Sequence, residues 1–186
     1  GLDYTLSTYA SEGGNFGFFT ANDMAKRLNA KMYAEAKRLG VKWILGGECG
    51  HMWRLVNQYM DTWNGPADFL EVPVSPITGT RFENAASTKM VHITEFTADL
   101  LYHDKIKVDP SRNDHLVVTY HDSCNTSRAM GLLEEPRYII NKVCNHFHEM
   151  PEEPIREKTL CCGSGSGLNA GAKMDLRMRR GFPRAN

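Results

Sequence analysis

The sequence predicts an α/β fold in which short parallel strands are flanked by helices. Apolar residues recur at helical spacing between residues 24 and 39, and the run at 41–45 is short and rich in aromatic and β-branched residues. A second such run lies at 115–120, and each run is followed by a glycine- or cysteine-bearing loop and another helix-like segment. The order helix, strand, loop, helix is typical of a parallel α/β sheet.

The first part of the chain contains two predicted helices and one predicted strand. The glycine-rich stretch 7–23 is expected to be a loop. Thr20 or Asn22 can cap the helix that follows, and Gly40 can end it. The apolar run after it predicts a buried strand, and residues 46–60 turn into the second helix.

The second part begins with a connection, residues 63–80, whose proline and glycine content predicts irregular structure. The clearest strand is expected at 115–120, and it ends in a loop that carries Cys124. Helices are expected at 94–102, 134–147 and about 170–179. Pro136 falls in the first turn of the second of these helices, where proline is tolerated.

Composition limits the classes of protein to consider. The chain has 186 residues, 41% hydrophobic and 24% charged, which is ordinary for a globular protein with a core. The formal net charge of zero argues against nucleic-acid binding. No run of about 20 apolar residues predicts a membrane span, and no signal peptide is recognisable. The chain begins at Gly1 and stops at Asn186 without a terminating element, so we interpret it as part of a longer protein.

The cysteines are the main functional signal. There are five of them, at positions 49, 124, 144, 161 and 162. Without evidence of secretion, metal binding or thiol chemistry is the expected use of an odd number of cysteines. Cys124 precedes the adjacent pair Cys161 and Cys162 by 36 residues, and loops at the carboxyl ends of parallel strands can meet. Three thiols at one place suit an iron–sulfur cluster or another thiophilic metal. The alternative is that the pair is simply buried, as free cysteines often are.

Small residues follow the cysteine pair at once, in the stretch "TLCCGSGSGLNAG". We expect Gly163, Gly165 and Gly167 to direct backbone N–H groups toward negative sulfur, and at least one of them to adopt a positive φ. The N-terminus of the helix that follows would add a partial positive charge. A similar glycine-rich stretch precedes the first helix, in "EGGNFGFFTANDMAKRL", which suggests a degenerate internal repeat.

The segments "YHDSCNTSR" and "LCCGSGSGL", at this spacing, resemble the cysteine-rich CCG module of heterodisulfide reductase catalytic subunits. Within that family the chain is most similar to DsrK-type subunits of the membrane complex DsrMKJOP of dissimilatory sulfur metabolism. The resemblance implies tandem CCG repeats. Residues 1–65 would be the C-terminal part of a degenerate first repeat, 66–114 a connection with a helix, and 115–186 the N-terminal part of a truncated second repeat.

The resemblance also implies a noncubane [4Fe–4S] cluster held by Cys124, Cys161 and Cys162, with Gly163 and Gly165 beside it. Any remaining ligand of the second repeat would lie beyond the end of this chain. The first repeat lacks its own CCG motif, so one cluster is expected.

Cys49 falls where the Cys-x-x-Cys of the first repeat would begin, but position 52 is Met. It is either a further ligand, with its Cα within about 10 Å of that of Cys161, or a relic or substrate-facing thiol. Cys144 is expected to be a buried thiol inside a helix.

His51 and His121 each lie within three residues of a candidate ligand, and either could donate a proton to a leaving thiolate. The alternative is that both only form supporting hydrogen bonds or caps. Arg54 and Arg128 follow their cysteines closely and are candidates to stabilise an anionic cluster or to bind an acidic partner.

The implied function is reduction or oxidation of a disulfide or trisulfide on a DsrC-like sulfur-carrier protein. The subunit would be cytoplasmic and peripheral, docked on the cytoplasmic face of a DsrMKJOP-like membrane complex. Three alternatives stay open: a heterodisulfide reductase acting on a small-molecule disulfide, a non-catalytic electron-transfer subunit, and an interaction module stapled by zinc or thiols.

Overall fold

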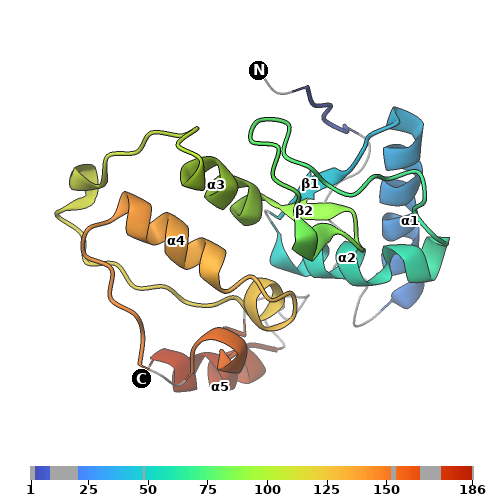
Figure 1. Ribbon diagram of the computed structural model, residues 1–186. Coiled ribbons are helices and arrows are strands. Elements are labelled where there is room, and N and C mark those ends of the chain that lie inside the picture. Colours follow the sequence, from blue (N-terminus) through green and yellow to red (C-terminus); the bar gives the residue numbers. More distant parts are fainter. Residues whose placement is uncertain (1–2, 9–20, 48, 152–153, 164–172, 186) are drawn as a thin grey trace. The chain divides into compact units, whose positions relative to one another are not determined.

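The computed structural model describes residues 3–8, 21–47, 49–151, 154–163 and 173–185 (Figure 1). It divides into two compact units, Gly1–Ile93 and Thr94–Asn186, and each is described by itself. The predicted loop 7–23 lies mostly outside the described residues. The division into CCG repeats at 65/66 and 114/115 stays a prediction.

The first unit pairs two short strands beside two helices (Figure 1). Its elements are α1 (Asn22–Leu39), β1 (Ile44–Gly46), α2 (Gly50–Asn64), η2 (Glu83–Ala85) and β2 (Met90–His92). The strands are parallel, with Ile44 opposite Met90 and Gly46 opposite His92. The predicted fold class, short parallel strands with flanking helices, is confirmed.

The helices α1 and α2 form as their apolar periodicity predicts. Gly40 ends α1 in the left-handed conformation, with a φ of 62°. Asn22 is the first helical residue rather than the cap, and Ala21 at the N-cap makes no side-chain hydrogen bond there. A buried amide joins the two helices, because Asn64 Nδ2 donates to Asn29 Oδ1 at 2.8 Å.

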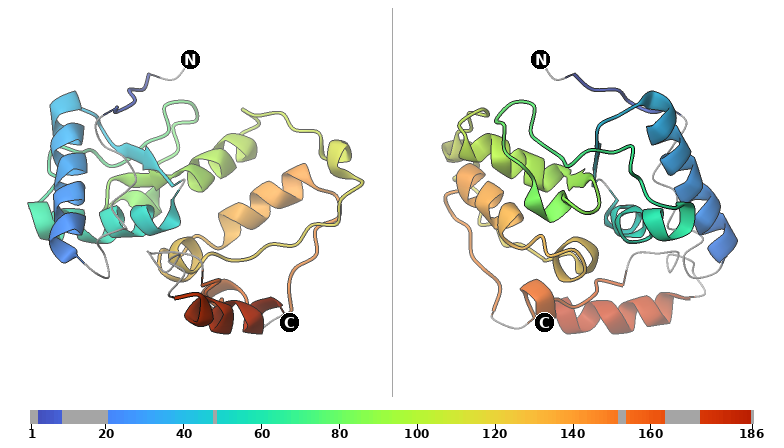
Figure 2. Two further views of the ribbon diagram at one scale, coloured as in Figure 1. Left: turned by 180° about the vertical axis from the view of Figure 1, so that it is seen from behind. Right: turned by 45° about the vertical axis from the view of Figure 1, so that its right-hand side comes forward.

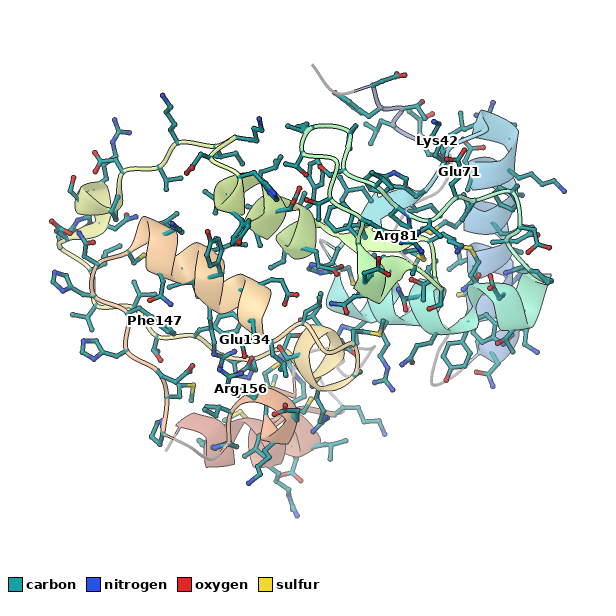
Figure 3. All side chains as sticks on the ribbon, in the orientation of Figure 1. Lys42, Glu71, Arg81, Glu134, Phe147 and Arg156 are labelled. Atoms are coloured by element: carbon teal, nitrogen blue, oxygen red, sulfur yellow. The ribbon has the colours of Figure 1, made fainter. Side chains whose placement is uncertain are left out.

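The connection between α2 and β2 is irregular, as predicted. Val74 and Arg81 form an isolated antiparallel bridge, and the Glu71 N–H donates to the Lys42 carbonyl at 2.6 Å. Lys42, Glu71 and Arg81 are labelled in Figure 3. These backbone contacts attach the connection to the segment that leads into β1.

The second unit is built mainly from helices and single turns (Figure 2). Its elements are α3 (Ile93–Tyr102, with its first residue in the other unit), η3 (Pro110–Asn113), η4 (Cys124–Arg128), α4 (Glu134–Val143), η5 (Arg156–Lys158) and α5 (Met174–Ala185). The helices α3 and α4 lie side by side, with the rings of Tyr102 and Tyr138 6.2 Å apart (Figures 1 and 2).

Two predicted elements of this unit differ from the structure. The stretch 115–120 forms no regular strand, and only Val118 pairs, in a parallel bridge with Phe147. Val117 is 78% exposed, so the apolar run does not face a sheet. The helix predicted to reach 147 ends at Val143, because the following residues extend toward this bridge, where the His148 N–H donates to the Val118 carbonyl at 2.8 Å.

Candidate metal centre formed by two cysteine loops

The first cysteine loop places Cys124 at the start of a single π turn, η4. Ser123 caps this turn, since its Oγ accepts hydrogen bonds from the Asn125 and Thr126 N–H groups at 3.3 and 3.5 Å. The Ala129 N–H donates to the Cys124 carbonyl at 3.2 Å, which is the wide i to i+5 spacing. Isolated π turns are frequent at functional sites.

The second cysteine loop follows η5 and carries the adjacent pair. Cys161 is half-buried and Cys162 is exposed. Gly163 adopts a φ of 77°, which confirms that one of the three glycines is in the left-handed region. Its N–H donates to Cys161 Sγ at 3.4 Å. Gly165 and Gly167 lie outside the described residues.

The side of α5 packs on this second loop. Arg177 Nε donates to the Gly163 carbonyl at 3.3 Å, and a Cβ at Gly181 would lie 3.6 Å from the Cys162 carbonyl. Both contacts come from the body of α5. The chain between Gly163 and α5 is outside the described residues, so the predicted placement of the helix N-terminus beside sulfur stays a prediction.

Three hydrogen bonds join the two loops. Thr159 Oγ1 donates to the Asp122 carbonyl at 2.7 Å, and Arg128 Nη1 donates to the Thr159 carbonyl at 3.0 Å. His121 Nε2 lies 3.4 Å from the Leu160 carbonyl, within hydrogen-bonding distance. His121 therefore supports the backbone of the second loop, which is the structural alternative considered for it.

The thiols of Cys124 and Cys161 share a hydrogen bond. Burial raises the pKa of the Cys124 thiol, and the nearby Cys161 and Cys162 raise it further, while Arg128 lowers it. The loops thus gather three sulfur ligands, as the sequence predicted for Cys124, Cys161 and Cys162.

The donor set can be tested against two kinds of metal centre. In the part of the chain that the structure describes, no three His, Cys, Asp or Glu side chains converge closely enough to hold one metal ion. In a [4Fe–4S] cluster each thiolate binds a different iron, so its ligands need not converge on one point. The residues present therefore fit a cluster, and they fit a mononuclear zinc site less well.

A buried ion network lies directly before Cys124. Arg137 donates to both carboxylate oxygens of Asp122, at 2.9 and 2.7 Å, and to Glu149 at 2.5 Å. Asp122 also accepts the Arg156 N–H at 2.7 Å. Burial alone would raise the pKa of Asp122, but these hydrogen bonds and the charge of Arg137 hold that pKa below its usual value. Sequence reasoning missed this network, since its members are far apart in the chain.

In the first unit Cys49 is the N-cap of α2, and its carbonyl accepts the Trp53 N–H at 2.9 Å. Its side chain is half-buried. Beside it, burial and then the charge of Arg54 lower the pKa of His51. The predicted approach of Cys49 to Cys161 joins the two units and stays a prediction.

The glycines before Cys49 do approach another group closely, and that group is His92. Gly47 has a φ of 121°, and a Cβ there would lie 2.4 Å from the His92 ring. The His92 ring also packs edge-on against Trp53, with centroids 5.1 Å apart. His92 was not singled out from the sequence, because the strand β2 that carries it was not predicted. Cys144, expected inside a helix, instead lies half-buried at the extended C-cap of α4.

With this geometry in view, comparison with known proteins identifies the second cysteine region. The cysteine-rich domain family CCG matches residues 118–182. The chain contains a CCG domain. This match includes Cys124, Cys161 and Cys162, and it confirms the cysteine-rich module that the sequence predicted.

Relatives extend the similarity over nearly the whole chain. It is 51% identical to Hdr-like menaquinol oxidoreductase iron-sulfur subunit 2 of Archaeoglobus fulgidus, over 99% of this chain and 36% of the relative. A similar subunit of Archaeoglobus profundus is 50% identical over 99% of this chain and 35% of its own length. The resemblance to DsrK-type, Hdr-like iron–sulfur subunits is therefore confirmed, and the chain spans about a third of these relatives.

A more distant relative matches only part of the chain. The dihydromethanophenazine:CoB–CoM heterodisulfide reductase of Methanosarcina acetivorans contains a polypeptide that is 43% identical over 84 residues, which are 45% of this chain and 20% of the relative. No solved structure matches the chain. No helix within the described ranges combines the length and apolar character that crossing a bilayer requires.

Proposed function

We propose that the intact protein is an Hdr-like iron–sulfur oxidoreductase subunit whose CCG domain binds one noncubane [4Fe–4S] cluster through Cys124, Cys161 and Cys162. The observation that carries this proposal is the joining of the two cysteine loops, with Cys161 hydrogen-bonded to Cys124. Cys49 is the candidate for a further ligand. When bound, the cluster would supply electrons one at a time to a reaction of a sulfur–sulfur bond that needs two.

The residues of this chain have separate tasks in that site. The three cysteines hold the cluster, and the Gly163 N–H stabilises negative charge on Cys161 sulfur. Arg128 supplies a cation beside Cys124 and fixes the second loop through the Thr159 carbonyl. His121 and His51 are proposed to hold the proton that a sulfur leaving group takes up, and Gly165 to lie beside the cluster.

We propose a disulfide or trisulfide of a DsrC-like sulfur-carrier protein as the substrate. The partners would be the other subunits of a DsrMKJOP-like complex at the cytoplasmic face of the membrane. The similarity to a subunit of a membrane-quinol enzyme, named a menaquinol oxidoreductase, supports a membrane complex. A small-molecule disulfide is the second candidate substrate, because a relative belongs to a CoB–CoM heterodisulfide reductase.

The ligand assignment is tested by Cys162→Ser in the intact protein, purified without oxygen, with Cys144→Ser as the matched control. Cys162→Ser should lower the iron content and abolish the paramagnetic signal of the oxidised cluster. Cys144→Ser should change neither, since Cys144 lies at the end of α4 outside both loops. Full iron and an unchanged signal in Cys162→Ser would remove Cys162 from the ligand set.

The substrate assignment is tested by mixing the reduced protein with each candidate and following reoxidation of the cluster. Reoxidation by a DsrC-like trisulfide, and slower reoxidation by the CoB–CoM heterodisulfide, supports the carrier protein. The reverse order supports the small molecule. If neither reoxidises the cluster while a quinone-linked partner does, the subunit only transfers electrons.

A further inference from the structure

We propose that Thr159 is a positioning residue that sets the separation of the two cysteine loops through its hydrogen bond to the Asp122 carbonyl. The proposal deepens the cluster site and rests on it. Thr159 and Asp122 occupy matching places, since each lies two residues before a proposed ligand, Cys161 and Cys124. Their hydrogen bond is therefore the nearest connection between the two loops on the N-terminal side of both cysteines.

The contacts of Thr159 hold its peptide unit from two sides. Its side chain has no exposed surface, and Oγ1 donates to the Asp122 carbonyl at 2.7 Å, a favourable length for such a bond. Its own carbonyl accepts Arg128 Nη1 at 3.0 Å. Arg128 belongs to η4, the turn that begins with Cys124, so both bonds lead to the first cysteine loop.

The Asp122 carbonyl is a fixed reference point for that bond. The residue is 1% exposed, and its carboxylate accepts two hydrogen bonds from Arg137 and one from the Arg156 N–H. Arg137 is in turn held by Glu149. A buried network in which each charge is paired has little freedom to shift. Thr159 therefore ties the Cys161 loop to a rigid part of the unit.

Loss of this tie should act on the cluster through the placement of sulfur. Groups that orient metal ligands without touching the metal typically contribute about 10–100-fold to affinity. Thr159→Val keeps the shape of the side chain and removes the donor, whereas Thr159→Ser keeps the hydroxyl. Thr78→Val is the matched control, because Thr78 Oγ1 donates to Thr80 Oγ1 at 3.0 Å in the first unit.

In the intact protein, Thr159→Val should shorten the half-life of the cluster against an iron chelator about tenfold. It should also shift the g-values of the oxidised cluster. Thr159→Ser and Thr78→Val should leave both close to wild type. If Thr159→Val does not fold, as judged by circular dichroism, Thr159→Ala replaces it. A wild-type half-life and signal in the folded variant, or equal losses in Thr159→Ser, would overturn the proposal.

A second measurement needs no cluster. In iron-free protein, diamide takes up two electrons and two protons from a pair of thiols and leaves a disulfide. Formation of the Cys124–Cys161 disulfide, followed by mass spectrometry, should slow several-fold in Thr159→Val and not in Thr159→Ser. Equal rates would overturn the positioning role. Absence of iron from the wild-type protein, with the predicted change in disulfide rate, would instead contradict the cluster proposal alone.

Discussion

The two units hold their cysteines by different physical means. Around Cys49 the structure is packed, with Gly47 against His92, His92 against Trp53 and buried apolar residues along α2. Around Cys124 and Cys161 it is polar. There the described residues that are buried beside the cysteine loops are Asp122, Asn125, Ser127, Arg137 and Thr159.

The difference matters because the two kinds of interaction respond differently to change. Apolar burial is non-directional and spread over many contacts. Hydrogen bonds and ion pairs depend on the position of a few atoms, and a buried group left without its partner is costly. The polar unit therefore places its sulfur atoms more exactingly and should be more sensitive to the loss of a single group.

The largest effect should come from Arg137→Met. It removes the partner of Asp122 and Glu149 and leaves a buried carboxylate unpaired, which should cost about 3–5 kcal/mol. Hydrogen exchange of amides in α4, measured on the intact protein, gives the loss of opening free energy. The control is Glu134→Gln, which breaks the exposed pair with Arg156 (Figure 3) and should cost less than about 1 kcal/mol. Equal losses would show that burial of the network does not matter.

A smaller effect is expected from Gly47→Ala in the packed unit. Strained backbone at a non-glycine residue costs about 1–3 kcal/mol, and the new Cβ also meets the His92 ring. Gly65→Ala is the control, since Gly65 has a φ of 88° but nothing within 4 Å of an added Cβ. Exchange of amides in α2 should show the larger loss for Gly47→Ala, and His92→Ala should recover part of it. Identical losses at both glycines would mean that the ring gives way freely.

The smallest effect needs only a change of pH. Burial lowers the pKa of His92 from 6.5, against a hydrogen bond with the Gly47 backbone that raises it. Stability from neutral His92 is complete above 6.5 and is lost as pH falls through the lowered pKa. The pKa of Asp122 is lowered from 3.8, so its contribution is lost only below that value.

Between neutral pH and pH 5, amides of α2 should therefore lose protection while those of α4 keep it. Hydrogen exchange corrected for intrinsic rates measures both in one sample. His92→Phe should remove the loss in α2. Earlier loss of protection in α4 would contradict the assignment of these two groups.

Local patterns predicted the helices well and the site in part. Apolar periodicity located α1, α2 and α3, and the cysteine spacing located the three thiols that the loops bring together. The run 115–120 misled, because its apolar residues suggest a sheet that its neighbours do not supply. His92 and the Asp122 network could not be found locally. Thr159 lies 37 residues from Asp122, and only the folded chain shows that they meet.

The π turn at Cys124–Arg128 gives the length of this segment a meaning of its own. A π turn holds one residue more than the α turn it replaces, so deletion of a single residue would allow a more regular helical turn. The same deletion would rotate Arg128 by about 100° relative to Cys124 and take it away from the Thr159 carbonyl. At this point the most regular backbone and the intact site are alternatives, and the chain carries the extra residue that favours the site.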